Sequence, residues 1–183
     1  MRAFARAAVI GVAIMTCSAP LTASGGDAFT VASPDAKVSV AFELLDGGPA
    51  YSISREGGPI VLPSKMGFRF RTRPDMLGPF DVLSCDRRSS DTPWRPVWGA
   101  DSEVRDNFNE MTIELRETAE PRRHMSIVFR AYDDGVAFRY LLPEGPGLTS
   151  FEIVSEETRF RFAEDLTAWW IPNDYDSYEH LFR

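Results

Sequence analysis

Apolar and polar side chains alternate with a period of two along much of this chain. The alternation is clearest in five runs, at residues 38–44, 66–70, 111–115, 125–131 and 136–140. Glycine-containing turn signals lie between these runs, at residues 46–48, 56–59 and 133–135. Because a period of two places every second side chain on one face, the runs predict half-buried β-strands joined by tight turns.

Roughly ten strand candidates follow one another at short spacing, and no window has the pattern of an amphipathic helix of three turns. Such a chain is predicted to be all-β, an antiparallel β-sandwich or barrel. Residues 72–103 are the least regular stretch, so we expect long connections there, carrying Trp94 and Trp98. No acid in the predicted strands is expected to be buried. Arg69, Arg71 and Arg73 alternate, which favours a solvated face with ion pairs over an anion-binding stripe.

Residues 1–23 have the pattern of a secretory signal peptide. Arg2 and Arg6 precede a short apolar stretch that is too short to span a membrane, and small residues follow. We therefore expect a periplasmic or secreted protein whose domain covers residues 24–183. Lipidation at Cys17 is the weaker alternative, because Ile14 and Thr16 match a lipobox poorly.

The charge and cysteine content narrow the possible partners. The formal net charge is −7 and becomes −9 once residues 1–23 are removed, since they contain two arginines and no acid. No long basic block is present, so neither a nucleic acid nor a membrane is expected as a partner. Removal of Cys17 would leave Cys85 alone, which excludes an internal disulfide.

The segment with the most candidate chemistry is residues 168–180, which contain four aromatic residues, three carboxylates and a histidine. Trp169 and Trp170 offer faces on which sugar rings can stack. Asp174, Asp176 and Glu179 offer oxygen atoms to sugar hydroxyls or to calcium, although the spacing excludes an EF-hand. An ordinary polar loop with a buried tryptophan remains the alternative.

A second candidate is the polar, tryptophan-containing stretch at residues 94–110. Its acids, amides and arginines suit the rim of a carbohydrate site, and they also suit an ordinary loop that leads into a strand. Elsewhere the sequence has no nucleophile elbow, zinc-protease motif or phosphate-binding loop. Neither His124 nor His180 lies in a recognisable catalytic context, and His124 is expected at the surface.

Several motifs in fixed order resemble the N-terminal region of glycoside hydrolase family 97. They are Ser33-Pro34-Asp35, residues 63–68, Trp94-Arg95-Pro96-Val97-Trp98-Gly99, residues 107–111, residues 129–140, Ala168-Trp169-Trp170-Ile171-Pro172 and Tyr175-Asp176-Ser177-Tyr178-Glu179. The resemblance extends over residues 29–183. The motif at residues 133–140 is weak evidence for this family when taken alone, whereas the whole series of motifs is specific for it.

The resemblance implies an exported bacterial α-glucosidase or α-galactosidase. In this family a mutarotase-like super-sandwich precedes a (β/α)8 barrel, and calcium lies in the active site. By motif, Glu179 corresponds to the glutamate that the sandwich contributes to calcium. Most catalytic carboxylates belong to the barrel, so they have no matching positions in this sequence. Because the sequence stops at Arg183, we expect an incomplete sandwich that is inactive alone and whose partners are the barrel and an oligosaccharide.

Three other classes of function stay open. A free-standing carbohydrate-binding β-sandwich would use the aromatic segments as its sugar platform. A mutarotase-like epimerase would need a histidine and a glutamate as acid and base, and the two histidines here are poorly placed for that role. A purely structural or interaction role is the third alternative.

Overall fold

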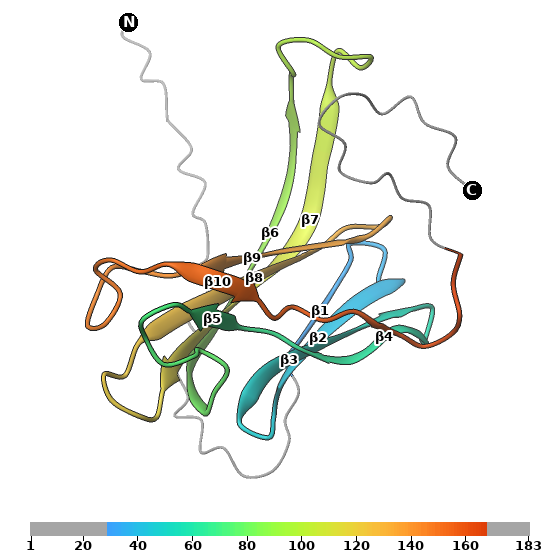
Figure 1. The fold of residues 1–183 in the computed structure, drawn as a ribbon. Coiled ribbons are helices and arrows are strands. Elements are labelled where there is room, and N and C mark those ends of the chain that lie inside the picture. The colour runs from blue at the N-terminus through green and yellow to red at the C-terminus, as the bar shows by residue number, and fades with distance from the viewer. Residues whose placement is uncertain (1–28, 168–183) are drawn as a thin grey trace, which may run out of the picture.

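The computed structural model describes residues 29–167, which form eleven β-strands and no helix. In chain order the strands are β1 (Phe29–Ala32), β2 (Val38–Leu45), β3 (Gly48–Arg55), β4 (Gly58–Lys65), β5 (Phe68–Phe70), β6 (Phe80–Trp94), β7 (Val104–Glu117), β8 (His124–Ala131), β9 (Val136–Leu141), β10 (Ile153–Glu156) and β11 (Arg161–Phe162). The prediction of an all-β fold is confirmed for this part of the chain (Figure 1).

The first sheet has the strand order β1-β2-β3-β4-β11, with neighbouring strands antiparallel. Asp46 and Gly47 join β2 to β3 with φ angles of 53° and 78°. Two successive positive φ angles are typical of a type I′ turn, whose twist matches that of the strands it connects. The predicted turn at this position is therefore confirmed, with Gly48 already in β3.

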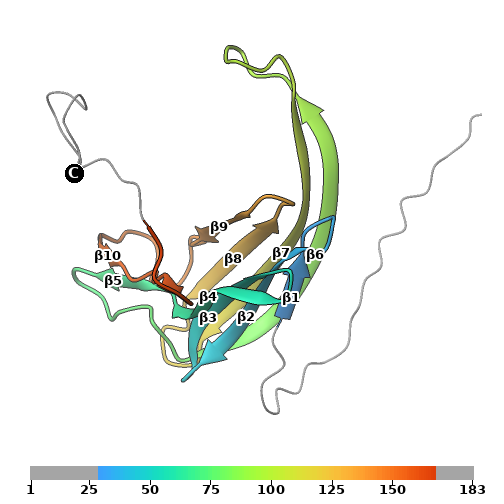
Figure 2. The same ribbon diagram turned by 90° about the vertical axis from the view of Figure 1, so that its right-hand side faces the viewer.

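The second sheet has the strand order β6-β7-β8-β9 and is also antiparallel. Asp133, Asp134 and Gly135 connect β8 to β9, as the sequence predicts. Figure 2 shows this sheet behind the first one, so that the two form the layers of a sandwich. The predicted antiparallel β-sandwich is thus confirmed.

The hydrophobic core lies between the two sheets. Phe42 of the first sheet and Phe129 of the second have ring centroids 6.3 Å apart, and Tyr51 lies 6.2 Å from Phe129. Ile113 and Ile127 are fully buried beside them. These residues occupy alternate positions of β2, β3, β7 and β8, so the period-two pattern is the direct cause of this core.

Residues 72–103 differ from the prediction. Residues 80–94 form β6, a strand of fifteen residues, instead of a long connection. β6 is an edge strand whose first part packs Phe80, Val82 and Cys85 against the core, with a register shift between Val82 and Ser84 that interrupts the alternation. From Asp86 onward most of its side chains are exposed on both faces, so this part has no apolar side to produce an alternating pattern. Trp94 is therefore the last residue of a strand, and only Trp98 lies in a connection.

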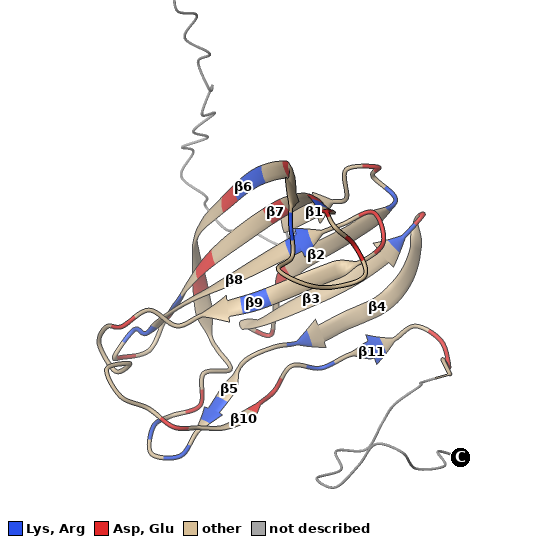
Figure 3. Ribbon diagram, turned by 90° about the horizontal axis from the view of Figure 1, so that it is seen from above, with Lys and Arg blue, Asp and Glu red and all other residues tan. Residues whose placement is uncertain are grey.

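The arginines on and after β5 form the solvated, ion-paired face that the sequence predicts. β5 pairs only with β10 in a small separate sheet. Arg69 binds Glu157 at 2.9 Å, Arg71 binds Glu152 at 2.7 Å, and Arg73 donates to a backbone carbonyl. Exposed pairs of this kind contribute up to about 1 kcal/mol each. Positive and negative residues are mixed over the strands and loops (Figure 3).

Two residues that the sequence singles out lie within the described part of the chain. Cys85 of β6 is a free, half-buried cysteine. His124 begins β8 and is exposed, so it is the surface histidine that the sequence predicts. The part of the chain that the structure describes contains no helix long and apolar enough to cross a membrane.

Candidate functional site

The principal predicted site lies outside the described residues. Trp169, Trp170, Asp174, Asp176 and Glu179 all belong to residues 168–183, so the predictions of sugar contacts and of a calcium ligand stay predictions. The same holds for the signal peptide at residues 1–23.

The second predicted segment, residues 94–110, contains two polar side chains that bind other parts of the chain. It runs from the end of β6 through a connection into β7, and its polar side chains have separate partners. Arg105 binds Asp91, with two hydrogen bonds of 2.7 Å. Asn109 donates to the backbone carbonyl of Ala32 at 2.8 Å. These two side chains are thus engaged within the protein, and the carbohydrate rim stays a prediction for the rest of the segment.

The far end of the β6–β7 hairpin carries two exposed tryptophans. We call residues 90–108 the arm. Trp94 is 53% exposed and Trp98 is 89% exposed, and both lie at the tip of the arm. Figures 1 and 2 show the arm projecting beyond the rest of the sandwich.

At the root of the arm, charged and aromatic residues form a cluster on the outer face of the second sheet. Phe108 is buried at its centre, and the Arg130 guanidinium carbon lies 4.1 Å from the Phe108 ring centroid. Arg88 lies 5.3 Å from the same centroid on the β6 side, and Tyr132 packs its ring 5.5 Å away. We call these residues, together with Glu110, the Phe108 cluster. Cations over an aromatic face are stabilising, most strongly where water is excluded.

Glu110 is the charged centre of this cluster, and it corrects the expectation that no strand acid is buried. The residue is only 6% exposed and accepts hydrogen bonds from Arg88 at 2.8 Å and from Arg130 at 2.7 Å. Burial acts to raise the pKa of Glu110, but the two arginines outweigh it and hold this pKa below its usual range. A carboxylate with a lowered pKa is ionised at neutral pH and is therefore a poor proton donor.

A second buried acid lies at the other end of β7. Glu117 is 7% exposed and pairs with Arg123, which is 2% exposed. Arg123 also donates hydrogen bonds to the backbone carbonyls of Pro74 and Asp75. With every polar group engaged inside the protein, this pair is suited to holding three segments together and not to binding a ligand.

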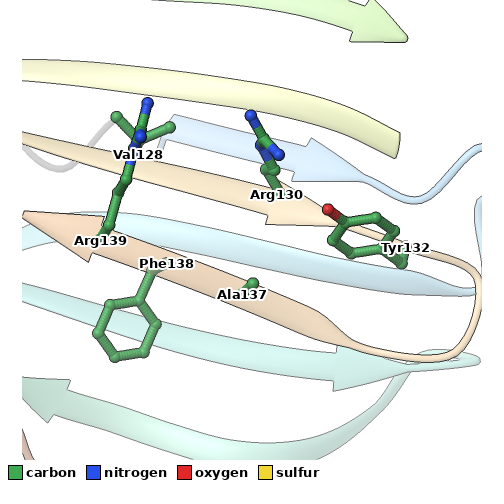
Figure 4. Close-up of a pocket in the computed structure, with 6 residues that line it drawn as sticks. All are labelled: Val128, Arg130, Tyr132, Ala137, Phe138 and Arg139. Atoms are coloured by element: carbon green, nitrogen blue, oxygen red, sulfur yellow. The ribbon is translucent and has the colours of Figure 1, made fainter. Parts of the chain in front are cut away.

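A shallow pocket of about 170 Å³ lies on the outer face of β8 and β9. Six residues line it: Val128, Arg130, Tyr132, Ala137, Phe138 and Arg139. Figure 4 shows the arginine side chains on one side of the strands and the Phe138 ring directed to the other. Arg130 is engaged by Glu110, and the Tyr132 hydroxyl donates to Asp106 at 3.3 Å. The lining has no carboxylate, so the described pocket lacks the paired acids that glycoside hydrolysis requires.

No group of three or more histidine, cysteine, aspartate or glutamate side chains within residues 29–167 is arranged to hold a metal ion.

Two antiparallel sheets packed on one apolar core define the class of the protein, a β-sandwich domain. The chain belongs to the family described as Glycosyl-hydrolase 97 N-terminal, whose model matches residues 31–183. The resemblance found in the sequence is thereby confirmed.

The curated relatives are glycosidases. The chain is 26% identical over 140 residues to a retaining alpha-galactosidase of Bacteroides thetaiotaomicron, and the match covers 76% of this chain and 20% of that enzyme. It is 27% identical over 145 residues to a probable retaining alpha-galactosidase of Streptomyces bingchenggensis, with coverage of 77% and 22%.

Solved structures agree with the family and with the fold. A glycoside hydrolase family 97 enzyme from Pseudoalteromonas sp. strain K8, solved in complex with acarbose, is 31% identical with a TM-score of 0.71. That match covers 74% of this chain and 20% of the enzyme. A beta-arabinopyranosidase is 29% identical with a TM-score of 0.66, over 73% of this chain and 21% of that one. The chain therefore spans about a fifth of the length of these relatives.

Proposed function

We propose that this chain is the N-terminal, substrate-cleft domain of an exported α-glycosidase that hydrolyses α-glucosidic or α-galactosidic bonds. The observation that carries the proposal is the family match over residues 31–183, in a chain that spans a fifth of the length of its glycosidase relatives. In this proposal the general acid and the base or nucleophile come from a (β/α)8 barrel in the same polypeptide. The sandwich alone is inactive.

The properties of the two buried glutamates support the proposal that the catalytic acid lies outside the sandwich. Glycoside hydrolysis needs a carboxylic acid that can donate a proton near neutral pH. Glu110 and Glu117 are both held by arginines, and the pKa of Glu110 is lowered. Neither carboxyl group therefore suits the role of general acid.

The proposed contribution of the domain to chemistry is Glu179. Its carboxylate is a hard oxygen ligand of the type that calcium prefers. Calcium, when bound, would polarise a substrate oxygen as a Lewis acid. Trp169 and Trp170 would stack on sugar rings, while Asp174 and Asp176 would accept hydrogen bonds from sugar hydroxyls. With residues 1–23 as a signal peptide, the enzyme would act in the periplasm or outside the cell.

The test is Glu179→Gln in the full-length protein, with Glu164→Gln as the matched control. Glu164 is an exposed glutamate near the end of the described residues, so its substitution should change neither calcium binding nor activity. In Glu179→Gln, calcium affinity should fall roughly tenfold or more, and calcium-dependent hydrolysis of α-glucosides or α-galactosides should fall with it. Calcium binding and activity equal to those of the control would exclude Glu179 as a ligand. A full-length protein that hydrolyses neither substrate would exclude the α-glycosidase activity itself.

A further inference from the structure

The arm is a two-stranded ribbon that the sandwich does not support along its length. β7 pairs with β8 only from Asn109 to Arg116. Beyond Asn109, residues 104–108 pair with residues 90–94 of β6 and with no third strand. Five residues of strand add about 17 Å, and the connection at residues 95–103 lies farther out still.

The arm is nevertheless braced. An isolated two-stranded hairpin is marginally stable in water, so a projecting ribbon needs additional contacts. Midway along it, the Arg105 guanidinium binds the Asp91 carboxylate through two hydrogen bonds of 2.7 Å. At its root, Phe108 is 2% exposed within the Phe108 cluster. The arm is thus positioned to present its tip in one direction.

The tip presents exposed apolar side chains beside an exposed ion pair between Arg95 and Glu103. Val97 is 100% exposed and Trp98 is 89% exposed, beside the half-exposed Trp94. Pro93 and Pro96 restrict the backbone between these residues and lower the entropy lost on binding. Exposed apolar patches mark interaction sites, and tryptophan is enriched among the residues that contribute most to protein interfaces.

We propose that the tip of the arm docks on the catalytic part of the same polypeptide, with Val97 and Trp98 buried in that interface. This inference rests on the proposed function, because it requires a catalytic part in the same chain. The relatives are about five times as long as the matched segment, so a protein of their length would contain a further part on which the tip could dock. The fully exposed Val97 favours a protein surface over a sugar, since an aliphatic side chain offers a sugar neither a stacking face nor a hydrogen bond.

The test is oxidative footprinting of the full-length protein, read by mass spectrometry at Trp94 and Trp98. Oxidation of Trp98 in the native protein should be roughly tenfold slower than in urea, as expected for an indole at the centre of an interface. A native rate within about twofold of the rate in urea would show that the tip is free and would overturn the proposal.

The same footprinting measurement distinguishes other binding partners of the tip, namely a second copy of the chain or a sugar. Protection that grows with protein concentration, together with a doubled mass in solution, would assign the tip to a second copy of the chain. Protection that requires added acarbose or maltotriose would assign it to a sugar. Either result overturns the proposal, which requires protection that is independent of concentration and of sugar.

A pair of variants tests the energetic coupling. Val97→Ser combined with Trp98→Ser should separate a single calorimetric unfolding transition of the full-length protein into two. Ile60→Ser, at a 42%-exposed apolar position of β4, is the control and should leave one transition. One unchanged transition in both proteins would contradict docking.

The two proposals fail in different ways. A full-length protein that is protected at Trp98 but inactive on α-glycosides would overturn the proposed function alone. An active protein with an unprotected tip would overturn the docking alone. A reading frame that closes at Arg183 would overturn both.

Discussion

Replacement of Arg123 by methionine tests whether the buried Arg123–Glu117 pair holds the sandwich together. The guanidinium binds the Glu117 carboxylate through Nε at 2.5 Å and Nη2 at 2.6 Å. It also donates to the carbonyls of Pro74 and Asp75, at 2.9 and 3.1 Å, and lies 5.3 Å from the Phe70 ring centroid. One side chain therefore joins the connection after β5 to the β7–β8 hairpin.

The magnitude follows from what the substitution leaves behind. Methionine fills much of the same space but removes the positive charge from a site where Glu117 is 7% exposed. Removing one member of a buried ion pair costs about 3–5 kcal/mol, because the other charge stays buried without compensation. Since a domain is stable by about 5–15 kcal/mol, this single change should remove a fifth or more of the free energy of unfolding.

Urea unfolding of the purified protein, followed by fluorescence, measures this loss as a lower transition midpoint at an unchanged slope. Arg71→Met is the matched control, because its pair with Glu152 is more than half exposed on both sides and should contribute less than about 1 kcal/mol. The double change Arg123→Met with Glu117→Leu should recover much of the loss, since it removes both charges. The reasoning is refuted if Arg123→Met costs no more than Arg71→Met, or if the double variant is no more stable than the single one.

Two further predictions concern pH. The pKa of Glu110 is lowered in the folded protein, so its stabilising contribution is present above the ordinary glutamate pKa of about 4.3 and is lost as the pH falls through the lowered value. Glu110→Gln should therefore flatten the acid limb of a plot of unfolding free energy against pH, and an unchanged limb would contradict this. Burial raises the pKa of Tyr51 to about 12, so the neutral phenol stabilises the fold below pH 10, and this contribution is lost as the pH rises toward 12. Tyr51→Phe should reduce the alkaline loss of stability, measured by urea unfolding at pH 9 to 11. The variant also loses the hydrogen bond from the Tyr51 hydroxyl to the Arg159 carbonyl. The same alkaline loss in the variant and in the unchanged protein would refute this prediction.

The sequence predicts best the strands that have one buried face. β2 and β8 follow directly from alternation, because Val40, Phe42, Ile127 and Phe129 all point into the same core. The turn at Asp46 and Gly47 could be predicted as well, since few residues other than glycine, asparagine and aspartate adopt positive φ easily. β6 could not be found in this way, because a register shift after Val82 interrupts its short apolar face and both faces of its second half are solvated.

The buried acids were missed for a different reason. Glu110 lies at a polar position of an alternating strand, where the pattern alone indicates exposure. It is buried because Arg88, twenty-two residues earlier, and Arg130, twenty residues later, cover it from neighbouring strands. Only the strand register, which pairs Arg88 with Glu110 and Glu110 with Arg130, brings the three together. A single sequence has no local signal for such a cluster.

These buried acids bear directly on where catalysis can reside. A general acid of a glycosidase must hold a proton near neutral pH, which requires an apolar or negatively charged surrounding that raises its pKa. Around Glu110 the strands place two guanidinium groups instead, and around Glu117 they place a third. Arginine stays charged at every pH near neutrality, so the two guanidinium groups around Glu110 favour its ionised form. Within residues 29–167 the fold thus uses its buried acids to fix the β6–β7 hairpin and the β7–β8 hairpin. In the proposed function, the proton transfer is supplied by carboxyl groups of the barrel, outside these residues.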